Sequence, residues 1–214
     1  MTNHLYDVFS KWSCTDGEHR NSIWIYSDPH FNDEDSKSFR GEKYPGDEEQ
    51  VRRINSKVGR KDTIIFLGDI CDVEFIKKVR GYKILLLGNH DKGASNYKRT
   101  KDENLFDEVY EGPLMINDRL ILSHEPIPGL PDYLFNIHGH AHDRKDFGER
   151  HLNVCAEHID YTPICLSSLL QDGLLKEVHS IHRTTIDSAI VRKAKKERKR
   201  ARRASVEQMG EDDE

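Results

Sequence analysis

The sequence predicts an α/β fold that contains a parallel β-sheet. Three runs of apolar and β-branched residues, at 22–27, 63–67 and 83–87, have the length of strands. Each run is apolar throughout instead of alternating with polar residues, which is typical of parallel strands buried on both faces. Segments with helical character separate the runs, so strands and helices alternate along the chain. The first half of the chain therefore predicts parallel strands joined by helices.

The two connecting segments predict helices at about 47–58 and 73–80. Asp47 is of a residue type that caps a helix at its N-terminus, because its carboxylate can accept hydrogen bonds from free backbone N–H groups. Gly59 and Gly81 stand where each helix has to end and the chain has to turn.

The second half of the chain predicts a partly antiparallel arrangement. The apolar stretches 114–116 and 120–122 flank Asn117-Asp118, a pair of residues suited to a tight hairpin turn. A hairpin pairs its two strands antiparallel, so the sheet should change character here. Two further strands are predicted at 133–137 and 151–154, followed by a short helix after Pro163.

A chain of 214 residues predicts one compact domain, here residues 1–186, followed by a charged tail at 187–214. Neither an apolar run long enough to span a membrane nor a signal-peptide core is apparent, so we expect no membrane association and a cytoplasmic location. The four cysteines show no C-x-x-C spacing, which favours free thiols in a reducing compartment over a zinc knuckle or a disulfide framework.

The tail concentrates charge of both signs. Residues 192–203 carry nine basic groups and one acidic group, and residues 205–214 carry five acidic groups. We expect an exposed helix that ends in a disordered acidic segment. The basic stretch has two interpretations, a simply solvated helix or a site for nucleic acid or another polyanion. With the tail set aside the body is acidic, as expected if carboxylates hold cations.

Each of the three predicted parallel strands runs directly into a group of polar residues. The carboxyl ends of parallel strands meet at one edge of a sheet, where α/β proteins bind ligands. Residues i and i+2 of an extended segment face the same way, and glycine allows the backbone to turn sharply. We therefore expect these groups to converge. They are Asp28-x-His30, Gly68-Asp69 and Gly88-Asn89-His90-Asp91.

Two histidine motifs follow predicted strands in the second half. His124 comes after 120–122, and the pair His140 and His142 comes after 133–137. Taken with the carboxylates, these residues form a set of oxygen and nitrogen donors without thiolate. Such a set suits Mn²⁺, Fe, Ni²⁺ or Zn²⁺ better than an iron–sulfur cluster or a structural zinc site. The sequence therefore predicts a metal site.

In this order the motifs resemble those of the calcineurin-like metallophosphoesterases, in particular the small bacterial and phage type. They read D-P-H, G-D-I-C-D, G-N-H-D, S-H and G-H-A-H, and the resemblance covers about residues 22–170. It implies an α/β fold of the metallophosphoesterase type, a mixed β-sandwich flanked by helices. One departure is that Asn32-Asp33 stands where members of this type often have Gly-His.

The resemblance also implies two bound divalent ions, with manganese first and iron, nickel or zinc as alternatives. His90 would contact the phosphate and protonate the leaving group, and Asp91 would orient its imidazole. Asp72 would support the site from outside, although Asp72 and Asp91 are equally suited to capping helices. The implied ligands are Asp28, His30 and His142 for the first ion, Asp69 for both, and Asn89, His124 and His140 for the second.

The activity that the resemblance implies is hydrolysis of a phosphomonoester or phosphodiester. A hydroxide shared by two cations about 3.5 to 4 Å apart would attack phosphorus in line. One alternative is a nuclease whose residues 192–203 bind the backbone of DNA or RNA. Another is a metal-binding scaffold without catalysis, although every expected ligand type is present. The sequence does not determine the natural substrate or the oligomeric state.

Overall fold

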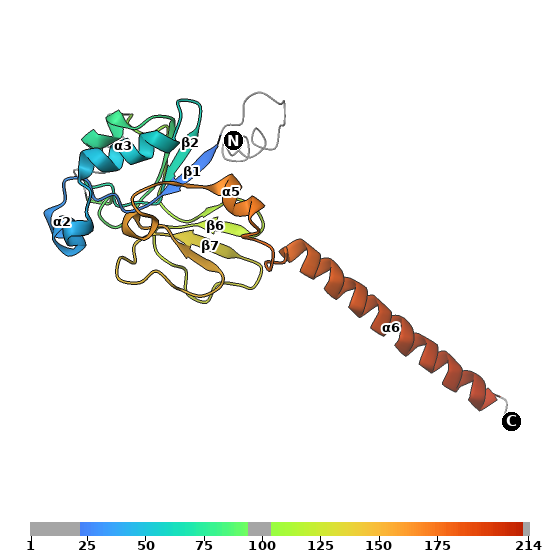
Figure 1. The fold of residues 1–214 in the computed structure, drawn as a ribbon. Helices are drawn as coiled ribbons and strands as arrows, with labels where there is room; N and C mark the ends of the chain where they lie inside the picture. Colours follow the sequence, from blue (N-terminus) through green and yellow to red (C-terminus); the bar gives the residue numbers. More distant parts are fainter. Residues whose placement is uncertain (1–21, 94–103, 212–214) are drawn as a thin grey trace.

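A five-stranded sheet forms one half of the body of the protein (Figure 1). The computed structural model describes residues 22–93 and 104–211. The predicted strands β1, β2 and β3 pair in parallel, as expected. Strand β4, which was not predicted, pairs in parallel with β3, and β9 pairs antiparallel with β1. The order across the sheet is β4 (Glu108–Tyr110), β3 (Tyr82–Leu86), β2 (Thr63–Phe66), β1 (Ile23–Tyr26) and β9 (Ile164–Cys165).

A second, four-stranded sheet forms the other half. Its first two strands are the predicted hairpin and pair antiparallel, but β6, β7 and β8 pair in parallel with one another. The antiparallel character of this sheet is therefore limited to the hairpin. The order is β5 (Leu114–Met115), β6 (Leu120–Leu122), β7 (Phe135–His138) and β8 (His151–Asn153).

The two sheets face each other across an apolar core. Ile25, Ile65 and Ile84 of the first sheet belong to the same buried cluster as Leu122 and Ile137 of the second, and all five are fully buried. The opposite face of the first sheet is covered by helices, with Ile54 and Ile76 in a second apolar cluster. Burial on both faces explains why β1 to β3 are apolar throughout. The expected mixed sandwich flanked by helices is confirmed.

The helices differ from the predictions in two details. The predicted helix at 73–80 is the 3-10 helix η2 (Val73–Lys78), and the carboxylate of Asp72 caps it by accepting a hydrogen bond from the Glu74 N–H at 3.1 Å. The predicted helix at 47–58 is α3 (Asp47–Lys57), but Gly46 occupies its N-cap. Asp47 instead accepts a hydrogen bond from the Asn32 N–H at 3.1 Å, so its carboxylate contacts the segment before α2 and does not cap α3.

Several short elements were not predicted. Helix α2 (Glu34–Arg40) has a sequence with little apolar periodicity, and it buries Ser36 and Arg40 instead of an apolar stripe. Strands β4 and β9 are too short for a pattern of alternation to develop. Two further unpredicted elements are η1 (Gly41–Lys43) and η3 (Ala156–Ile159). In contrast, α5 (Leu166–Gln171) is the short helix expected after Pro163.

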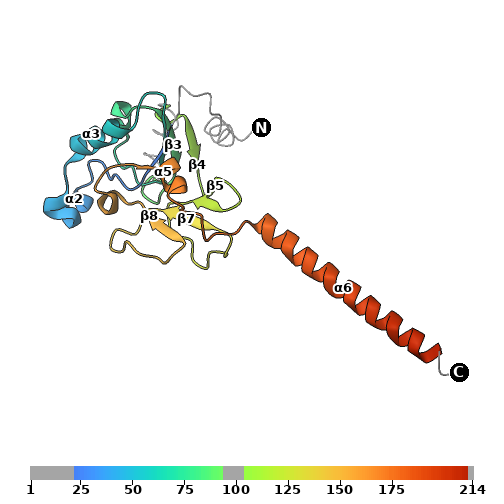
Figure 2. The ribbon, with the colours of Figure 1, turned by 45° about the vertical axis from the view of Figure 1, so that its right-hand side comes forward.

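The C-terminal helix α6 (Ile181–Glu211) projects away from the two sheets, as Figures 1 and 2 show. It begins before Asp187, where the sequence places the start of the tail. Residues 185–199 of this helix are exposed to solvent. Within the described ranges, the structure contains no helix that combines the length and the apolar character needed to cross a membrane.

Candidate metal centre

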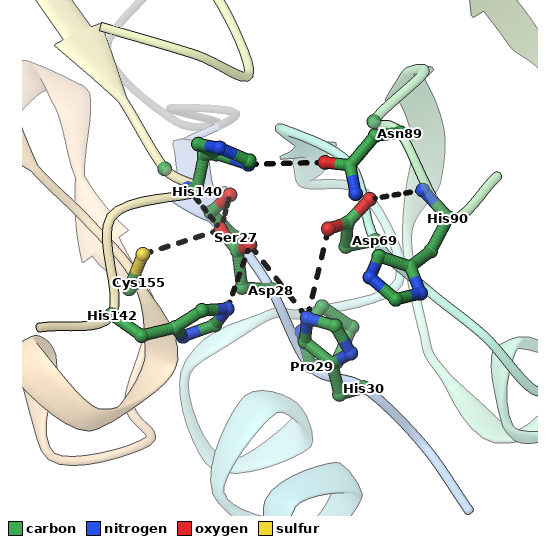
Figure 3. Close-up of polar contacts among 12 residues, drawn as sticks. Ser27, Asp28, Pro29, His30, Asp69, Asn89, His90, His140, His142 and Cys155 are labelled. Carbon is green, nitrogen blue, oxygen red and sulfur yellow. Dashed lines mark hydrogen bonds and ion pairs between the residues drawn. The ribbon is translucent and has the colours of Figure 1, made fainter. Parts of the chain in front are cut away.

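The predicted ligand residues lie where strands of both sheets end, and Figure 3 shows most of them facing one another. The first four motif residues follow β1, β2 and β3, and the three histidines of the second half follow β6 and β7. The two sheets therefore contribute to one site at their carboxyl ends. The residues concerned are Asp28, His30, Asp69, Asn89, His124, His140 and His142.

Asp28, His30 and His142 form one group of potential ligands. Their donor atoms all lie within 4.8 Å of one another. The Nε2 atoms of His142 and His30 lie 3.6 and 3.9 Å from Oδ1 of Asp28. Three donors at such distances can surround a single cation.

Asp69, His124 and His140 form a second group with the same 4.8 Å limit. Nε2 of His124 lies 3.4 Å from Oδ2 of Asp69. The amide oxygen of Asn89 belongs to this group as well, because its Oδ1 lies 2.9 Å from Nε2 of His124 and 3.0 Å from Nδ1 of His140. The second group thus contains one carboxylate, one amide oxygen and two imidazoles.

Asp69 lies between the two groups. Its Oδ2 atom is 3.6 Å from Nε2 of His30 in the first group and 3.4 Å from Nε2 of His124 in the second. Its other oxygen accepts a hydrogen bond from the His90 N–H at 2.9 Å, which fixes the orientation of the carboxylate. This position agrees with the bridging role that the family resemblance implies.

Two buried donor atoms of the first group lack a hydrogen-bond partner among the described residues. They are Oδ1 of Asp28 and Nε2 of His30, in residues that are 0% and 3% exposed. A buried polar atom without a partner is costly, and both atoms face the other donors. A divalent cation would satisfy both, so the donor set fits a metal site.

The outer nitrogens of three histidines are each held by an acceptor. Nδ1 of His30 lies 2.7 Å from Oδ2 of Asp33, Nδ1 of His142 lies 2.6 Å from Oε1 of Glu157, and Nδ1 of His124 lies 2.7 Å from the carbonyl oxygen of Leu67. An acceptor at Nδ1 favours the tautomer with its proton there. The lone pair of Nε2 is then directed into the site, as in metal-binding histidines.

Asp33 and Glu157 were missed by the sequence analysis. Asp33 also accepts a hydrogen bond from the Asp35 N–H at 3.2 Å and caps α2, so the signal that its residue type offered was that of a helix N-cap. Glu157 lies in η3, away from every motif, and no local pattern distinguishes it. Burial would raise the pKa of Glu157, but the hydrogen bond from His142 and the charge of Arg40 outweigh it and lower the pKa.

The carboxylate of Asp69 is ionised for a similar reason. Burial would raise the pKa of Asp69, but the hydrogen bond and charge of His124 lower it. The same pair acts on the histidine, since burial would lower the pKa of His124 and the hydrogen bond to Asp69 contributes most to raising it to about 9. Without metal, His124 therefore carries a proton next to the ionised carboxylate of Asp69.

Four potential ligands have left-handed backbone conformations. The φ angles are 55° at Asp28, 47° at His30, 55° at Asp69 and 67° at His140. Residues other than glycine rarely adopt such angles, which cost about 1 kcal/mol or more each. The four sharp turns direct the side chains into the site, so local stability is given up for the arrangement of the donors.

Close approach of the backbone explains two glycines. A Cβ atom on Gly88 would overlap the carboxylate of Asp69, and one on Gly139 would overlap the Ser27 hydroxyl and the Asp28 carboxylate. The expected need for glycine next to the ligands is confirmed at Gly88.

The remaining predicted site residues take different positions. The His90 side chain is exposed, and its ring centroid lies 5.0 Å from that of His30. Asp91 is buried and accepts hydrogen bonds from the backbone N–H groups of Asp69, Ile70 and Gly88 at 2.7, 2.8 and 2.9 Å. Among the contacts of the described residues, neither the expected contact of Asp91 with the His90 imidazole nor one between Asp72 and a ligand occurs.

Two thiols border the site without belonging to the predicted donors. Sγ of Cys71 lies 3.3 Å from Nδ1 of His30, and Sγ of Cys155 lies 3.4 Å from Oδ2 of Asp28. Burial raises the pKa of both thiols, and the nearby carboxylates add to this effect. Without metal, both thiols are therefore protonated.

Comparisons with known proteins agree with this geometry. The model of the calcineurin-like phosphoesterase family matches residues 22–190. A crystal structure of a protein of unknown function from Aquifex aeolicus superimposes with a TM-score of 0.57 and 25% sequence identity, covering 71% of this chain and 98% of that chain. No curated protein matches the chain. Because the family model spans most of the chain, the protein belongs to the calcineurin-like phosphoesterase family and is a metal-dependent phosphoesterase.

Proposed function

We propose that the protein hydrolyses a phosphomonoester or phosphodiester with two divalent ions, and that manganese is the preferred metal. The observation that carries this proposal is the position of Asp69, whose Oδ2 atom lies 3.6 Å from His30 and 3.4 Å from His124. One carboxylate that contacts both groups of donors is what a pair of closely spaced cations requires. The proposed ligands are Asp28, His30 and His142, then Asn89, His124 and His140, with Asp69 shared.

The chain's own residues would divide the work as follows. The ions, when bound, supply positive charge that offsets the phosphate and lower the pKa of water at the site. Asp28 and Asp69 hold that charge at a buried position, and the acceptors on Nδ1 keep His30 and His142 oriented. The exposed ring of His90 lies beside His30, where its imidazole can give a proton to the departing oxygen.

The proposal is tested by hydrolysis of bis-p-nitrophenyl phosphate with added Mn²⁺. We expect Asp69→Asn to abolish both tight metal binding and turnover. His90→Ala should lower kcat by about 10²- to 10⁴-fold, the usual contribution of proton transfer, while the protein still binds metal. His179→Ala, an exposed histidine remote from the motifs, is the control. Full activity of both site variants would overturn the mechanism.

A second candidate is a nuclease, and the charge of α6 favours it. The stretch 192–199 is helical, exposed and contains six basic residues and one acidic residue. The helix projects away from the sheets (Figure 2), so a nucleic acid bound to it would contact the protein at a surface separate from the metal centre. Clustered lysine and arginine bind phosphate backbones with a strong dependence on salt.

Deleting residues 192–214 distinguishes the candidates. If the protein is a nuclease that uses this helix, cleavage of single-stranded DNA or RNA should collapse and lose its steep salt dependence, while turnover of bis-p-nitrophenyl phosphate persists. A variant in which the basic residues of 192–199 are changed to glutamine keeps the helix and serves as the matched test of charge. A protein that binds Mn²⁺ but hydrolyses no phosphate ester would instead be a non-catalytic scaffold.

A further inference from the structure

Phe39 is an apolar residue in an unusual position. It lies near the end of α2 and is 55% exposed. Exposing a phenyl ring forgoes the roughly 1.5 kcal/mol or more that its burial would contribute. The other exposed large apolar residues of the described chain are aliphatic and lie on β5 or α6. They are Met115, Ile181, Ile186, Ile190 and Val191.

The ring of Phe39 lies at the rim of the metal centre. Its centroid is 4.9 Å from that of His142, and the two rings are inclined by 55°. Nε2 of the same histidine lies 3.6 Å from Oδ1 of Asp28. One side of the phenyl ring therefore borders a proposed metal ligand, and the rest of it is open to solvent.

The neighbouring residue holds Phe39 in place. Arg40 is buried, and its guanidinium donates hydrogen bonds to the carbonyl oxygens of Asp28 at 2.6 Å and Pro29 at 3.0 Å. Its Cζ atom lies 5.5 Å from the centroid of the Phe39 ring. The end of α2 is thus attached to the loop that carries the first ligands, so the position of the phenyl ring is fixed relative to the metal centre.

A fixed and exposed aromatic ring next to a phosphate site has a simple chemical use. Planar rings stack on aromatic side chains, and a base stacks with little regard to its identity because every base has a π face. The carboxylates of Asp28 and Glu157 lie next to His142 and would repel a second anionic group of a substrate. The nearby guanidinium of Arg40 is buried and already paired with Glu157. Stacking is therefore better suited than ion pairing to hold the organic part of an ester here.

We propose that Phe39 is a stacking surface for the base of a nucleotide, so that the substrate is a nucleotide ester. This inference rests on the proposed function, because it assumes that the phosphate group sits at the metal centre. It concerns a specificity-determining contact and assigns Phe39 no part in the bond cleavage.

The competing explanation is that Phe39 only packs against His142. In that case its removal would disturb a metal ligand, and binding of every phosphate compound would weaken alike. A pair of ligands that differ only in the base separates the two explanations. AMP and ribose 5-phosphate form such a pair, since both carry the same sugar phosphate.

The experiment is calorimetric titration of the Mn²⁺-loaded protein with each compound, in the His90→Ala background, which slows hydrolysis of either phosphomonoester. We expect AMP to bind more tightly than ribose 5-phosphate. Phe39→Ala and Phe39→Leu should weaken AMP by about 5- to 150-fold, the usual effect of losing one base stack, and leave ribose 5-phosphate unchanged. Phe39→Trp should retain the preference for AMP. Leucine keeps the apolar bulk without a flat ring, so it separates stacking from burial.

Met115→Ala, which removes another exposed apolar side chain, is the matched control and should change neither affinity. Equal weakening of both ligands in Phe39→Ala, accompanied by weaker Mn²⁺ binding, would overturn the proposal. Equal binding of the two compounds by the His90→Ala protein with Phe39 intact would also overturn it. Failure of the proposed function has a different signature, namely absence of turnover of bis-p-nitrophenyl phosphate by the wild type.

Discussion

Glu157 connects His142 to Arg40. Its Oε1 atom lies 2.6 Å from Nδ1 of His142, and its Oε2 atom lies 3.0 Å from Nη2 of Arg40. Arg40 in turn donates a hydrogen bond to the carbonyl oxygen of Asp28. One carboxylate therefore ties together the segments after β1 and β7, which belong to different sheets and carry ligands of the same group.

Glu157→Gln should weaken metal binding without unfolding the protein. Glutamine preserves the size of the side chain but removes the charge that holds the imidazole and the guanidinium. Loss of such an outer partner costs about 10- to 100-fold in metal affinity. Titration with Mn²⁺ measures the change, and Glu42→Gln, an exposed carboxylate on η1, is the control. An unchanged Mn²⁺ affinity would show that His142 needs no partner.

Asp33→Ser separates the two contacts of Asp33. Serine caps a helix about as well as aspartate, so α2 should keep its N-cap and the melting temperature should change little. The shorter side chain does not reach Nδ1 of His30, which Asp33 contacts at 2.7 Å. Affinity for Mn²⁺ should fall by about 10- to 100-fold. Asp35→Ser on the exposed side of the same helix is the control, and equal affinities in the two variants would contradict the prediction.

Asp91→Ala should destabilise the fold. The alanine variant leaves three buried N–H groups, those of Asp69, Ile70 and Gly88, without their acceptor. Each such group costs about 1 kcal/mol or more, so we expect the free energy of unfolding to drop by about 3 kcal/mol. Urea denaturation measures it.

The comparison variant for Asp91 is Asp72→Ala, which removes the cap of η2 and an exposed hydrogen bond from the Asn32 side chain, and should cost about 1 kcal/mol. If Asp91→Ala unfolded at the wild-type urea concentration and lost turnover alone, the role of Asp91 would be to orient His90. The two carboxylates, which the sequence treats alike, thus have separable roles.

The sequence predicted the parts of the molecule in which a local pattern and the tertiary structure agree. Strands β1, β2 and β3 are buried on both faces, so their apolar runs are unmistakable, and the motifs that follow them have to meet at one edge of the sheet. This is why the sequence groups Asp28, Asp69 and Asn89 as candidate ligands. The glycine at 88 followed from the same geometry.

What the sequence could not predict depends on contacts between distant segments. Helix α2 buries Arg40 through hydrogen bonds to carbonyl oxygens and an ion pair with Glu157, which lies 117 positions away in the chain. Neither residue belongs to an apolar pattern, and ion pairs carry no periodicity. Asp91 was misleading because its carboxylate follows His90 directly, while its partners are backbone groups that leave no trace in the sequence.

The protonation of His124 predicts opposite pH dependences for the metal-free and metal-loaded protein. Burial would lower the pKa of His124, but the hydrogen bond and charge of Asp69, together with Asp28, raise it from 6.5 to about 9. A raised pKa in the folded state means that protonation stabilises the metal-free fold. That contribution is fully present below about pH 6.5 and is lost as the pH rises through about 9. Metal binding has to displace the same proton, so affinity for Mn²⁺ should increase by about tenfold per pH unit in this range.

Thermal unfolding in the presence of a chelator should therefore show a melting temperature that falls from pH 6.5 to 9. The increase in melting temperature that Mn²⁺ causes should become larger as the pH rises within that range. In His124→Ala both slopes should flatten, because the proton has lost its site. If the melting temperature of the metal-free wild type instead rose with pH, His124 would be neutral in the folded protein and would carry no proton next to Asp69.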